Sequence, residues 1–509
     1  MYSVVSCAIV HGIDSLLVRA ETDLSNGLPV FEMVGFLGSE VKEARERVRT
    51  AMHNCGYALP VKRITVNLSP ANIRKSGSGF DLPVAVSILA AMEVISRADL
   101  SDIVMIGELG LNGRIYPVNG VLPMILAAAD CGKKCCIVPQ ENVREASLVP
   151  DMEIVGAADL KAVVDYLNEG IRPEPPEGPA EDTEKEEEAD FRFVNGQKLL
   201  RRACEVAAAG LHNLLMIGPP GSGKTMVAKC IPSILPPMNR GEQMELSKIY
   251  SVCGKFAERG SLMDRRPFRS PHHTISQVGL VGGGRIPHPG EVSLAHGGVL
   301  FLDELTEFRR DAMESLRQPL EDRKVSVVRA NGSFTYPAEF VLVAAMNPCK
   351  CGYYPDLSRC RCTQADIDRY MGRISQPLLD RIDICVEAPR LDFADIHGSG
   401  DNESSADIRK RVLAVLQLQR RRFAGTDISY NSRIPAKDIE RYCRLGKKEE
   451  QYMAQLYQKL SLTARTYHKL LRVARTIADL DGNEEIGITH LTECVCYRSI
   501  DKSGWEWGQ

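Results

Sequence analysis

The chain has 509 residues, of which 44% are hydrophobic and 25% are charged, and its formal net charge is −3. This length is more than one hydrophobic core organises, so we expect about two to four domains, and the composition excludes a globally disordered protein. Basic residues do not outnumber acidic ones, so a nucleic-acid surface would have to be a local patch.

No apolar run reaches the roughly 18 residues that a membrane-spanning helix needs, and the first residues lack a basic region followed by an apolar stretch. We therefore expect a cytoplasmic protein without a membrane partner. Most of the 16 cysteines stand singly in apolar stretches, as Cys204, Cys230 and Cys385 do. This pattern favours reduced, buried thiols over disulfides.

The first part of the chain, residues 1–168, mixes two periodicities. Alternating apolar runs predict strands, and apolar positions at helical spacing predict helices. The strands are expected at residues 3–10, 63–68 and 134–138, and the helices at residues 39–55 and 82–95. The mixture indicates an α+β domain.

Prolines and a block of carboxylates fill residues 172–190, where little can be buried. We interpret residues 169–190 as a solvated acidic linker between two ordered parts. An alternative is that the acidic run mimics DNA or binds a partner.

Short apolar strands alternate with helices after the linker, which is typical of α/β nucleotide-binding domains with a parallel sheet. The expected strands are residues 213–217, 299–302, 340–345 and 384–387. From about residue 404 only helical periodicity remains, at residues 406–423, 449–460, 464–480 and 488–498. We therefore divide this part into a core, residues 191–400, and a helical lid, residues 401–509.

A phosphate-binding motif follows the first of these strands. The run Gly218-Pro-Pro-Gly-Ser-Gly-Lys224-Thr225 fits G-x-x-x-x-G-K-[ST]. Its backbone N–H groups can surround phosphates, Lys224 can reach the β and γ oxygens, and Thr225 can bind Mg²⁺. We expect ATP to be bound by Gly218, Pro219, Pro220, Gly221, Ser222, Gly223, Lys224, Thr225 and Met226.

Hydrolysis also requires a carboxylate that holds the metal and a group that activates water. The apolar residues 299–302 end at Asp303 and Glu304. Asp303 is expected to hold Mg²⁺ together with Thr225, and Glu304 to act as the base for the attacking water. The pair predicts an ATPase rather than a protein that only binds nucleotide.

Two further catalytic candidates follow in chain order. Asn347 comes directly after the strand at residues 340–345, so its amide is expected beside the γ-phosphate. Arg381 precedes the strand at residues 384–387 and can serve a neighbouring subunit's nucleotide as an arginine finger.

This order of motifs resembles the magnesium-chelatase-like AAA+ ATPases known as the YifB or ComM family. The resemblance rests on residues 210–218, 270–274, 291–304, 345–352 and 472–480, and it extends over nearly the whole chain. It implies a P-loop AAA+ core in a hexameric ring that uses ATP and Mg²⁺. It also implies action on branched or duplex DNA, in branch migration during recombination or natural transformation. A rival from another class is an ATP-driven protein-remodelling or chelatase-type motor.

The resemblance also implies further residue roles. Arg465, at the start of a lid helix, corresponds to the second sensor that contacts the γ-phosphate, and Arg472 is the alternative. Two insertions are expected, at residues 275–291 and 325–336, and Asn331-Gly332 predicts a tight β-hairpin in the second. That hairpin either tracks DNA in the ring's pore or only packs against its neighbour. Basic DNA-contact candidates are Arg323, Lys324, Arg329, Arg74 and Lys75.

Four cysteines form a CxC…CxC pattern, Cys349-Lys-Cys351 and Cys360-Arg-Cys362. Four thiolates so close together favour a structural Zn²⁺ that ties down the intervening loop. Reduced, unligated cysteines are the alternative.

The N-terminal domain resembles the proteolytic domain of Lon, a ribosomal S5-type fold, chiefly through residues 107–120. Lon-type proteolysis requires a serine nucleophile and a lysine base. Asp81 and Leu122 stand where these two are expected, with Ser78 nearby. We therefore expect the fold without the protease.

Overall fold

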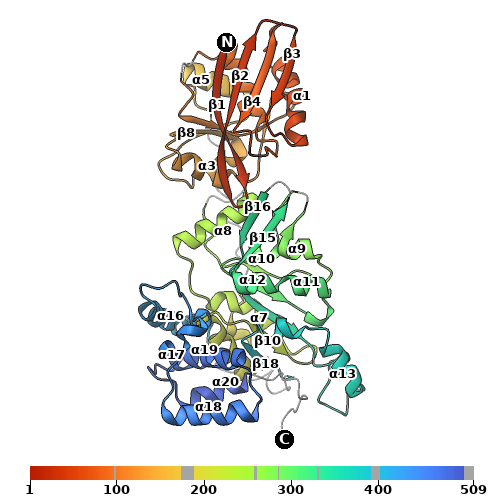
Figure 1. Cartoon of the computed structure of the whole chain (residues 1–509), viewed down its shortest axis with the longest axis vertical. Coiled ribbons are helices and arrows are strands. Elements are labelled where there is room, and N and C mark those ends of the chain that lie inside the picture. The colour runs from red at the N-terminus through yellow and green to blue at the C-terminus, as the bar shows by residue number, and fades with distance from the viewer. Residues whose placement is uncertain are drawn as a thin grey trace.

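The computed structural model describes residues 1–96, 99–173, 189–256, 261–284, 286–329, 332–390 and 402–497. The molecule is elongated, and its N-terminal part stands at one end of the long axis (Figure 1). Most of the predicted acidic linker, residues 174–188, lies outside the described residues, so the linker stays a prediction.

The N-terminal part is built on a seven-stranded mixed sheet in the order β3-β4-β2-β1-β5-β8-β9. Its strands are β1 (Tyr2–His11), β2 (Asp14–Ser25), β3 (Val30–Val34), β4 (Arg63–Ser69), β5 (Ile103–Met105), β8 (Cys135–Pro139) and β9 (Glu153–Ala157), with β6 (Glu108–Leu109) and β7 (Ile115–Tyr116) forming a separate small pair. The helices are α1 (Ser39–Asn54), α2 (Asp81–Ala91), α3 (Val121–Asp130), α4 (Val143–Ala146) and α5 (Leu160–Glu169). The strands and helices expected in this part are thereby confirmed, except that the helix expected at residues 82–95 ends at Ala91.

The second sheet has five strands in the order β11-β14-β17-β10-β18, and every neighbouring pair is parallel. The strands are β10 (Leu214–Ile217), β11 (Phe268–Arg269), β14 (Val299–Leu302), β17 (Val341–Met346) and β18 (Ile384–Glu387). The predicted parallel sheet is confirmed. Because the carboxyl ends of parallel strands meet at one edge, the residues that follow β10, β14 and β17 come together there.

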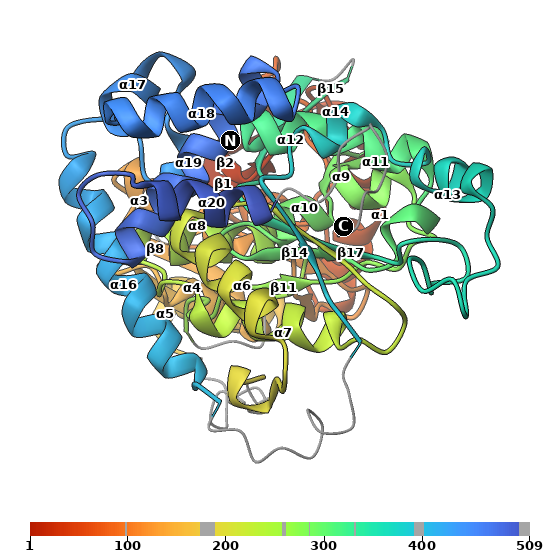
Figure 2. The same ribbon diagram turned by 90° about the horizontal axis from the view of Figure 1, so that it is seen from below.

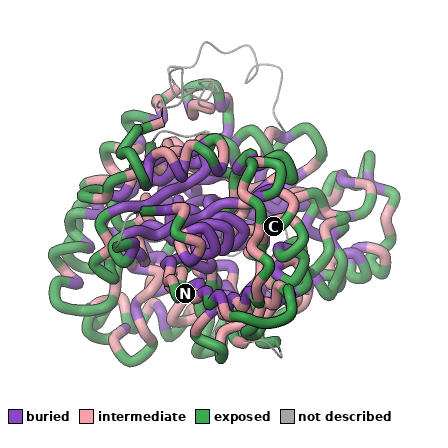
Figure 3. The backbone as a smooth tube through the Cα atoms, turned by 90° about the horizontal axis from the view of Figure 1, so that it is seen from above, coloured by how far each residue is buried: buried purple, intermediate pink, exposed green. Residues whose placement is uncertain are grey.

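Both faces of this sheet are covered, as the continuous apolar runs require. Leu214 and Met216 pack into one core with α6 (Lys198–Gly210) and α7 (Lys224–Ile234), whereas Leu215 and Ile217 face a second core on the other side. Buried backbone is concentrated in the centre of the molecule (Figure 3). The sheet is therefore a rigid platform for the loops at its edge.

The two predicted insertions lie side by side. The first holds α9 (Gln277–Val281) and the short pair β12 (Gly282–Gly283) and β13 (His288–Pro289). The second is the antiparallel hairpin β15 (Lys324–Arg329) and β16 (Gly332–Pro337), which confirms the predicted hairpin. Gly332, which we expected in the turn, instead pairs with Arg329 and belongs to β16. Asn331 lies outside the described residues.

The N-terminal part rests on α8 (Arg240–Val252) and on the β15–β16 hairpin (Figure 1). Apolar residues of α3 and α8 share one buried core, and the backbone N–H of Gly120 donates to the carbonyl of Ser251 at 3.0 Å. The ring of His11, at the end of β1, lies 4.8 Å from that of Phe334 in β16. The two parts are therefore joined by a packed interface.

After β18 the described chain forms only helices, in agreement with the predicted helical segments. Grouped in Figure 2, they are α16 (Ser405–Arg422), α17 (Ile439–Tyr442), α18 (Lys447–Lys459), α19 (Ala464–Leu480) and α20 (Ile488–Cys496). Their apolar faces pack into the same core as α6 and α7. Among all described helices, none combines the length and the apolarity that crossing a bilayer requires.

The remaining short helices are α10 (Glu291–Leu294), α11 (Arg310–Ser315), α12 (Arg317–Asp322), α13 (Gln364–Met371) and α14 (Gln376–Leu379). Of these, α12 precedes the hairpin, and α13 follows the loop that carries the four cysteines.

Candidate active site

The glycine-rich loop turns between β10 and α7 as the motif predicts. Gly223 caps α7 with a φ of +82°, a backbone conformation that side chains other than glycine rarely adopt. Lys224 is buried, and its Nζ donates to the carbonyls of Gly218 and Pro219, each at 2.8 Å. The ammonium is therefore held inside the loop, where a nucleotide's phosphates would sit.

Burial lowers the pKa of Lys224 to about 8, although the nearby negative charge of Asp303 opposes the shift. The lysine is thus a cation at neutral pH that is poorly compensated inside the protein. A phosphate would supply the missing negative charge.

Thr225 and Asp303 meet at the same edge of the sheet. The Thr225 hydroxyl donates to Oδ2 of Asp303 at 2.8 Å. A hydroxyl and a carboxylate are oxygen ligands of the kind that Mg²⁺ prefers, and few protein ligands suffice because Mg²⁺ usually keeps waters and binds the nucleotide's phosphates. The donor set therefore fits Mg²⁺.

Glu304 follows in a left-handed conformation, with φ at +51°. A residue other than glycine in this region carries strain, and such strain is common at functional sites. Its carboxylate is exposed and lies 3.7 Å from Nδ1 of His273. Sequence reasoning did not assign His273 a role. Its run, residues 270–274, served only to identify the family.

Asn347 completes this edge of the sheet. Its side chain follows β17, and its Oδ1 lies 3.5 Å from Nζ of Lys224. The structure thus brings together five predicted residues from three strand ends, namely Lys224, Thr225, Asp303, Glu304 and Asn347. Their assigned catalytic roles remain predictions.

Arg381 and Arg465 lie at a different place. The carbonyl of Arg381 accepts from Nδ2 of Asn213, which immediately precedes β10, so Arg381 is at the amino end of the strand whose carboxyl end carries the glycine-rich loop. The four residues of β10 separate the two ends by about 13 Å. Lys469, in the same helix as Arg465, donates to the Ile382 carbonyl at 2.6 Å. Both arginines therefore lie on the side of the sheet where the parallel strands begin, opposite the glycine-rich loop.

One carboxylate binds both arginines. Oε1 of Glu321, in α12, lies 2.5 Å from Nη2 of Arg381 and 2.6 Å from Nη2 of Arg465. Partial burial opposes ionisation of Glu321, but hydrogen bonds from the two arginines hold its pKa below the ordinary value. Glu321 was not predicted from the sequence, because a single glutamate in a helix carries no local signal.

More cations surround this pair. Within the described residues, the Nε atoms of Arg381, Arg433 and Arg472 are buried and have no hydrogen-bond partner. Burial lowers the pKa of Arg433 to about 10, with the charge of Arg323 acting in the same direction. Arg381 and Arg433 already pair with Glu321 and Glu339, but the unused, buried Nε donors still favour a further hydrogen-bond acceptor here.

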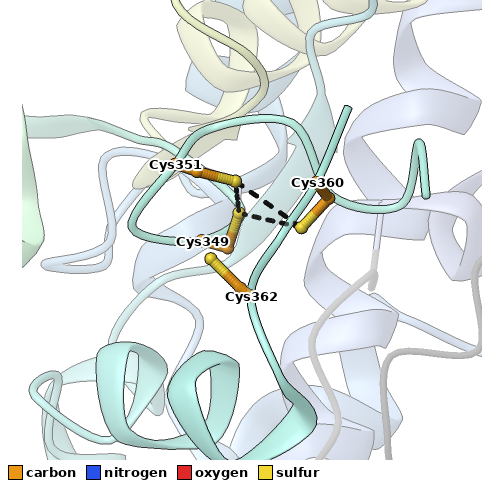
Figure 4. Close-up of side chains that lie close together, drawn as sticks. All are labelled: Cys349, Cys351, Cys360 and Cys362. Atoms are coloured by element: carbon orange, nitrogen blue, oxygen red, sulfur yellow. Dashed lines mark hydrogen bonds between the residues drawn. The ribbon is translucent and has the colours of Figure 1, made fainter. Parts of the chain in front are cut away.

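The four cysteines converge as their spacing predicts. Their Sγ atoms all lie within 4.8 Å of one another, between the end of β17 and the start of α13 (Figure 4). Burial opposes ionisation of Cys351, but a backbone hydrogen bond from Tyr353 and contacts with the other thiols lower its pKa to about 6. One thiolate therefore forms readily at neutral pH.

In the N-terminal part, the two positions aligned with the serine and lysine of Lon hold Asp81 and Leu122, and neither can supply a nucleophile–base pair. Asp81 is fully buried, and it pairs with Nε and Nη2 of Arg47 at 2.7 Å and 3.0 Å. Leu122 is an apolar core residue whose N–H donates to Glu145 at 3.0 Å. Both positions therefore serve the packing of the domain.

One predicted DNA contact is wrong. Lys75 was expected to reach phosphates from a flexible loop, but its side chain is fully buried and its Nζ donates to the carbonyl of Pro70. Arg329 is exposed at the end of β15, and its Nε donates to the Gly284 carbonyl at 3.3 Å. Arg329 thus remains accessible, while Lys75 does not.

Comparison with known proteins identifies the family that the chain matches. The chain matches "Magnesium chelatase, subunit ChlI" over residues 190–396, "Subunit ChlI of Mg-chelatase" over residues 20–142, and "Magnesium chelatase, subunit ChlI C-terminal" over residues 402–498. The competence protein ComM of Haemophilus influenzae is 43% identical over 509 residues, which cover 97% of this chain and 98% of that protein.

The uncharacterized protein YifB of Salmonella typhimurium is 41% identical over 506 residues, with 98% of each chain covered. A partial similarity also exists, since Lon protease 2 of Bacillus subtilis is 34% identical over 151 residues, or 28% of this chain and 27% of that protein.

Proposed function

The chain belongs to the magnesium chelatase ChlI family, within the group of full-length relatives that includes ComM and YifB, and on this basis we propose that it is a Mg²⁺-dependent AAA+ motor that acts on DNA. Membership of this family implies an ATPase. The observation that carries the proposal is the contact of Thr225 with Asp303 beside the buried, cationic Lys224, with Glu304 and Asn347 at the same edge.

Each residue has a distinct task in this proposal. Lys224 binds the β and γ oxygens of ATP, and Thr225 and Asp303 hold Mg²⁺, which neutralises charge on the phosphates when bound. Glu304 accepts a proton from the attacking water, and Asn347 orients that water against the γ-phosphate. His273, 3.7 Å from Glu304, positions this carboxylate.

Arg381 and Arg465 act on the nucleotide of the neighbouring subunit. Their position near the amino end of β10, the end opposite their own glycine-rich loop, supports this assignment. The arginine-rich edge then meets the nucleotide of the next chain, which requires a closed ring. We propose a homohexamer, as the family resemblance implies.

The DNA assignment rests on the near full-length similarity to a competence protein and on the exposed end of the hairpin with Arg329. We propose that the motor drives branch migration in recombination or natural transformation. Residues 1–168 serve as a Lon-like domain without peptidase activity, and residues 401–509 as a lid over the core.

ATP turnover of the purified protein tests this function, measured with Mg²⁺ and with no DNA, single-stranded DNA, duplex DNA or a four-way junction at low salt. We expect branched or duplex DNA to raise the rate severalfold, and the junction to be converted to separated duplexes. ATPase activity that no DNA alters, with no junction binding, would favour the chelatase-type or protein-remodelling motor.

A further inference from the structure

We propose that Cys349, Cys351, Cys360 and Cys362 bind one Zn²⁺ and that this ion braces the ATP site. The loop that the ion closes contacts the glycine-rich loop and leads into α13, after which Arg373 contacts the segment that follows Glu304. The inference rests on the proposed ATPase function.

The thiol geometry suits a single ion. The Sγ of Cys349 lies 3.3 Å from that of Cys351 and 3.8 Å from that of Cys360, and the Sγ of Cys351 lies 3.5 Å from that of Cys360. A tetrahedral Zn²⁺ with Zn–S bonds of about 2.3 Å would place its ligands about 3.8 Å apart. The sulfurs of Cys349, Cys351 and Cys360 therefore need to move by only a few tenths of an ångström, and that of Cys362 lies within 4.8 Å of the other three. An all-sulfur set selects zinc over Mg²⁺.

The loop has little else to hold it. Between Cys349 and Gln364 the chain forms no helix or strand, and the local core contains only Cys349, Cys360 and Ile367 as buried members. An apolar cluster this small stabilises a loop weakly, whereas a structural Zn²⁺ contributes folding free energy directly. The cysteines are thus the main source of order available to this segment.

The first link to the ATP site is Gly352. Its N–H donates to the Cys349 carbonyl at 3.0 Å, and its φ is +84°. A Cβ added at Gly352 would lie 2.6 Å from Cδ of Pro220 in the glycine-rich loop. The cysteine loop therefore packs directly against the phosphate-binding loop, at a position where only glycine fits.

The second link runs through the two ends of the cysteine loop. Asn347 precedes Cys349 by two residues, and its amide oxygen lies 3.5 Å from Nζ of Lys224. After Cys362, Thr363 caps α13, and Arg373 beyond this helix pairs with Glu307 at 3.1 Å and donates to the Thr306 carbonyl at 3.3 Å. An ion at the four sulfurs would therefore fix the sensor and the segment after Glu304 with respect to each other.

Loss of the ion should therefore misplace catalytic groups. A displacement of about 1 Å can lower turnover about 100-fold even when no catalytic residue is changed. We expect zinc loss to lower ATP turnover by about this factor and to weaken ATP binding in the same samples.

The test compares Cys362→Ser with Cys362→His, since histidine also binds zinc. Zinc per chain is measured by elemental analysis, affinity with a fluorescent ATP analogue, and folding by circular dichroism. Wild type and Cys362→His should carry about one zinc, whereas Cys362→Ser should lose zinc and bind the analogue more weakly. Cys131→Ser, an exposed cysteine in the N-terminal part, is the matched control and should change neither quantity.

Gly352→Ala tests the contact between the cysteine loop and the glycine-rich loop separately from zinc binding. It should keep zinc and still weaken the analogue, because its methyl group displaces Pro220. If Cys362→Ser does not fold, a thiol reagent that releases zinc from wild type, followed by a colorimetric chelator, gives the same readout.

Wild-type protein without bound zinc would contradict the proposed metal site. Zinc loss without any change in analogue affinity would contradict the proposal that the ion supports the ATP site. If wild type holds zinc but fails to bind the analogue, the ATPase proposal fails while the metal site stands.

Discussion

Arg381 and Arg465 share one carboxylate oxygen, Oε1 of Glu321, although they come from segments more than eighty residues apart in the sequence. The contact holds a largely buried cation, Arg381, and an exposed one, Arg465, close together on the side of the sheet where the strands begin. Under the proposed assignment to a neighbouring subunit's nucleotide, each arginine would have to leave Glu321, or share it, when that nucleotide binds.

Replacement of either arginine should therefore abolish turnover and spare nucleotide binding. We expect Arg381→Ala to lower the rate about 10³-fold or more, the effect typical of an arginine finger. The check is ATP turnover alongside binding of a fluorescent ATP analogue. Mixing Arg381→Ala with Lys224→Ala subunits should restore part of the rate, because some sites then pair an intact loop with an intact arginine. Mixtures that stay as inactive as their components would show that the arginine acts within its own chain.

Lys224→Ala and Glu304→Gln should fail at different steps. The first removes the ammonium that the loop carbonyls hold, so ATP binding should be lost. The second keeps the shape of the side chain and removes the base, so ATP should bind and persist unhydrolysed. Equilibrium binding and single-turnover hydrolysis distinguish the two. Normal turnover by Glu304→Gln would exclude it as the base.

ATP affinity should depend on pH through Lys224, whose pKa burial lowers to about 8. The free protein loses this positive charge as pH rises through 8, so binding of phosphates must then take up a proton. Affinity should fall by up to about tenfold per pH unit above that point. Titrations from pH 6.5 to about 9.5 check this. Lys224→Arg keeps its charge over the range, and its affinity should vary much less. A wild-type affinity that is flat across pH 8 contradicts the prediction.

Asp81→Asn should destabilise the N-terminal part, because Asp81 has a structural and not a catalytic role. Asp81 is fully buried and pairs with the partly exposed Arg47, so the cost should lie below the roughly 3–5 kcal/mol of breaking a fully buried pair. Urea unfolding followed by circular dichroism measures the change. Asp102→Asn is the control, because its pair with Lys134 is exposed and such pairs contribute about 0–1 kcal/mol. Equal effects of the two variants would mean that the buried pair adds nothing.

If the hairpin contacts DNA, Arg329→Ala should reduce the dependence of DNA affinity on salt. Each phosphate contact on duplex DNA adds about 0.9 to the log-log slope, so the slope should fall by about that amount. Fluorescence anisotropy at several salt concentrations gives the slope. Lys134→Ala, a highly exposed lysine in the N-terminal part, is the comparison and should leave it unchanged. An unaltered slope for Arg329→Ala removes this residue from the DNA surface.

The convergence of the candidate ATP-site residues could be predicted because their signals are local. Lys224, Thr225, Asp303 and Asn347 each follow an apolar strand, and parallel pairing alone brings strand ends together. The four cysteines were predictable for a similar reason, since two short pairs bracket one loop.

Other features depend on tertiary contacts that no window of sequence contains. Lys75 looks like an exposed cation in a glycine-rich loop, yet its side chain is fully buried, and its backbone forms hydrogen bonds with Phe36 and Gly38. The pairing of Glu321 with Arg465 arises only because α19 packs near α12 in the folded chain. Gly332 was expected in the turn of the hairpin, but its pairing with Arg329 makes it part of the strand.

The apolar interface between α3 and α8 has a practical consequence for dissecting this protein. The acidic run looks like the natural place to cut, but α8 belongs to the ATPase side and its Leu246 and Ile249 are fully buried in the core shared with Val121 and Ile125 of α3. A fragment that begins after the run would present these side chains to water and should tend to aggregate. Co-expression of both halves as separate chains should instead reassemble the interface. The chain can therefore be divided at the acidic linker only if both halves are kept together.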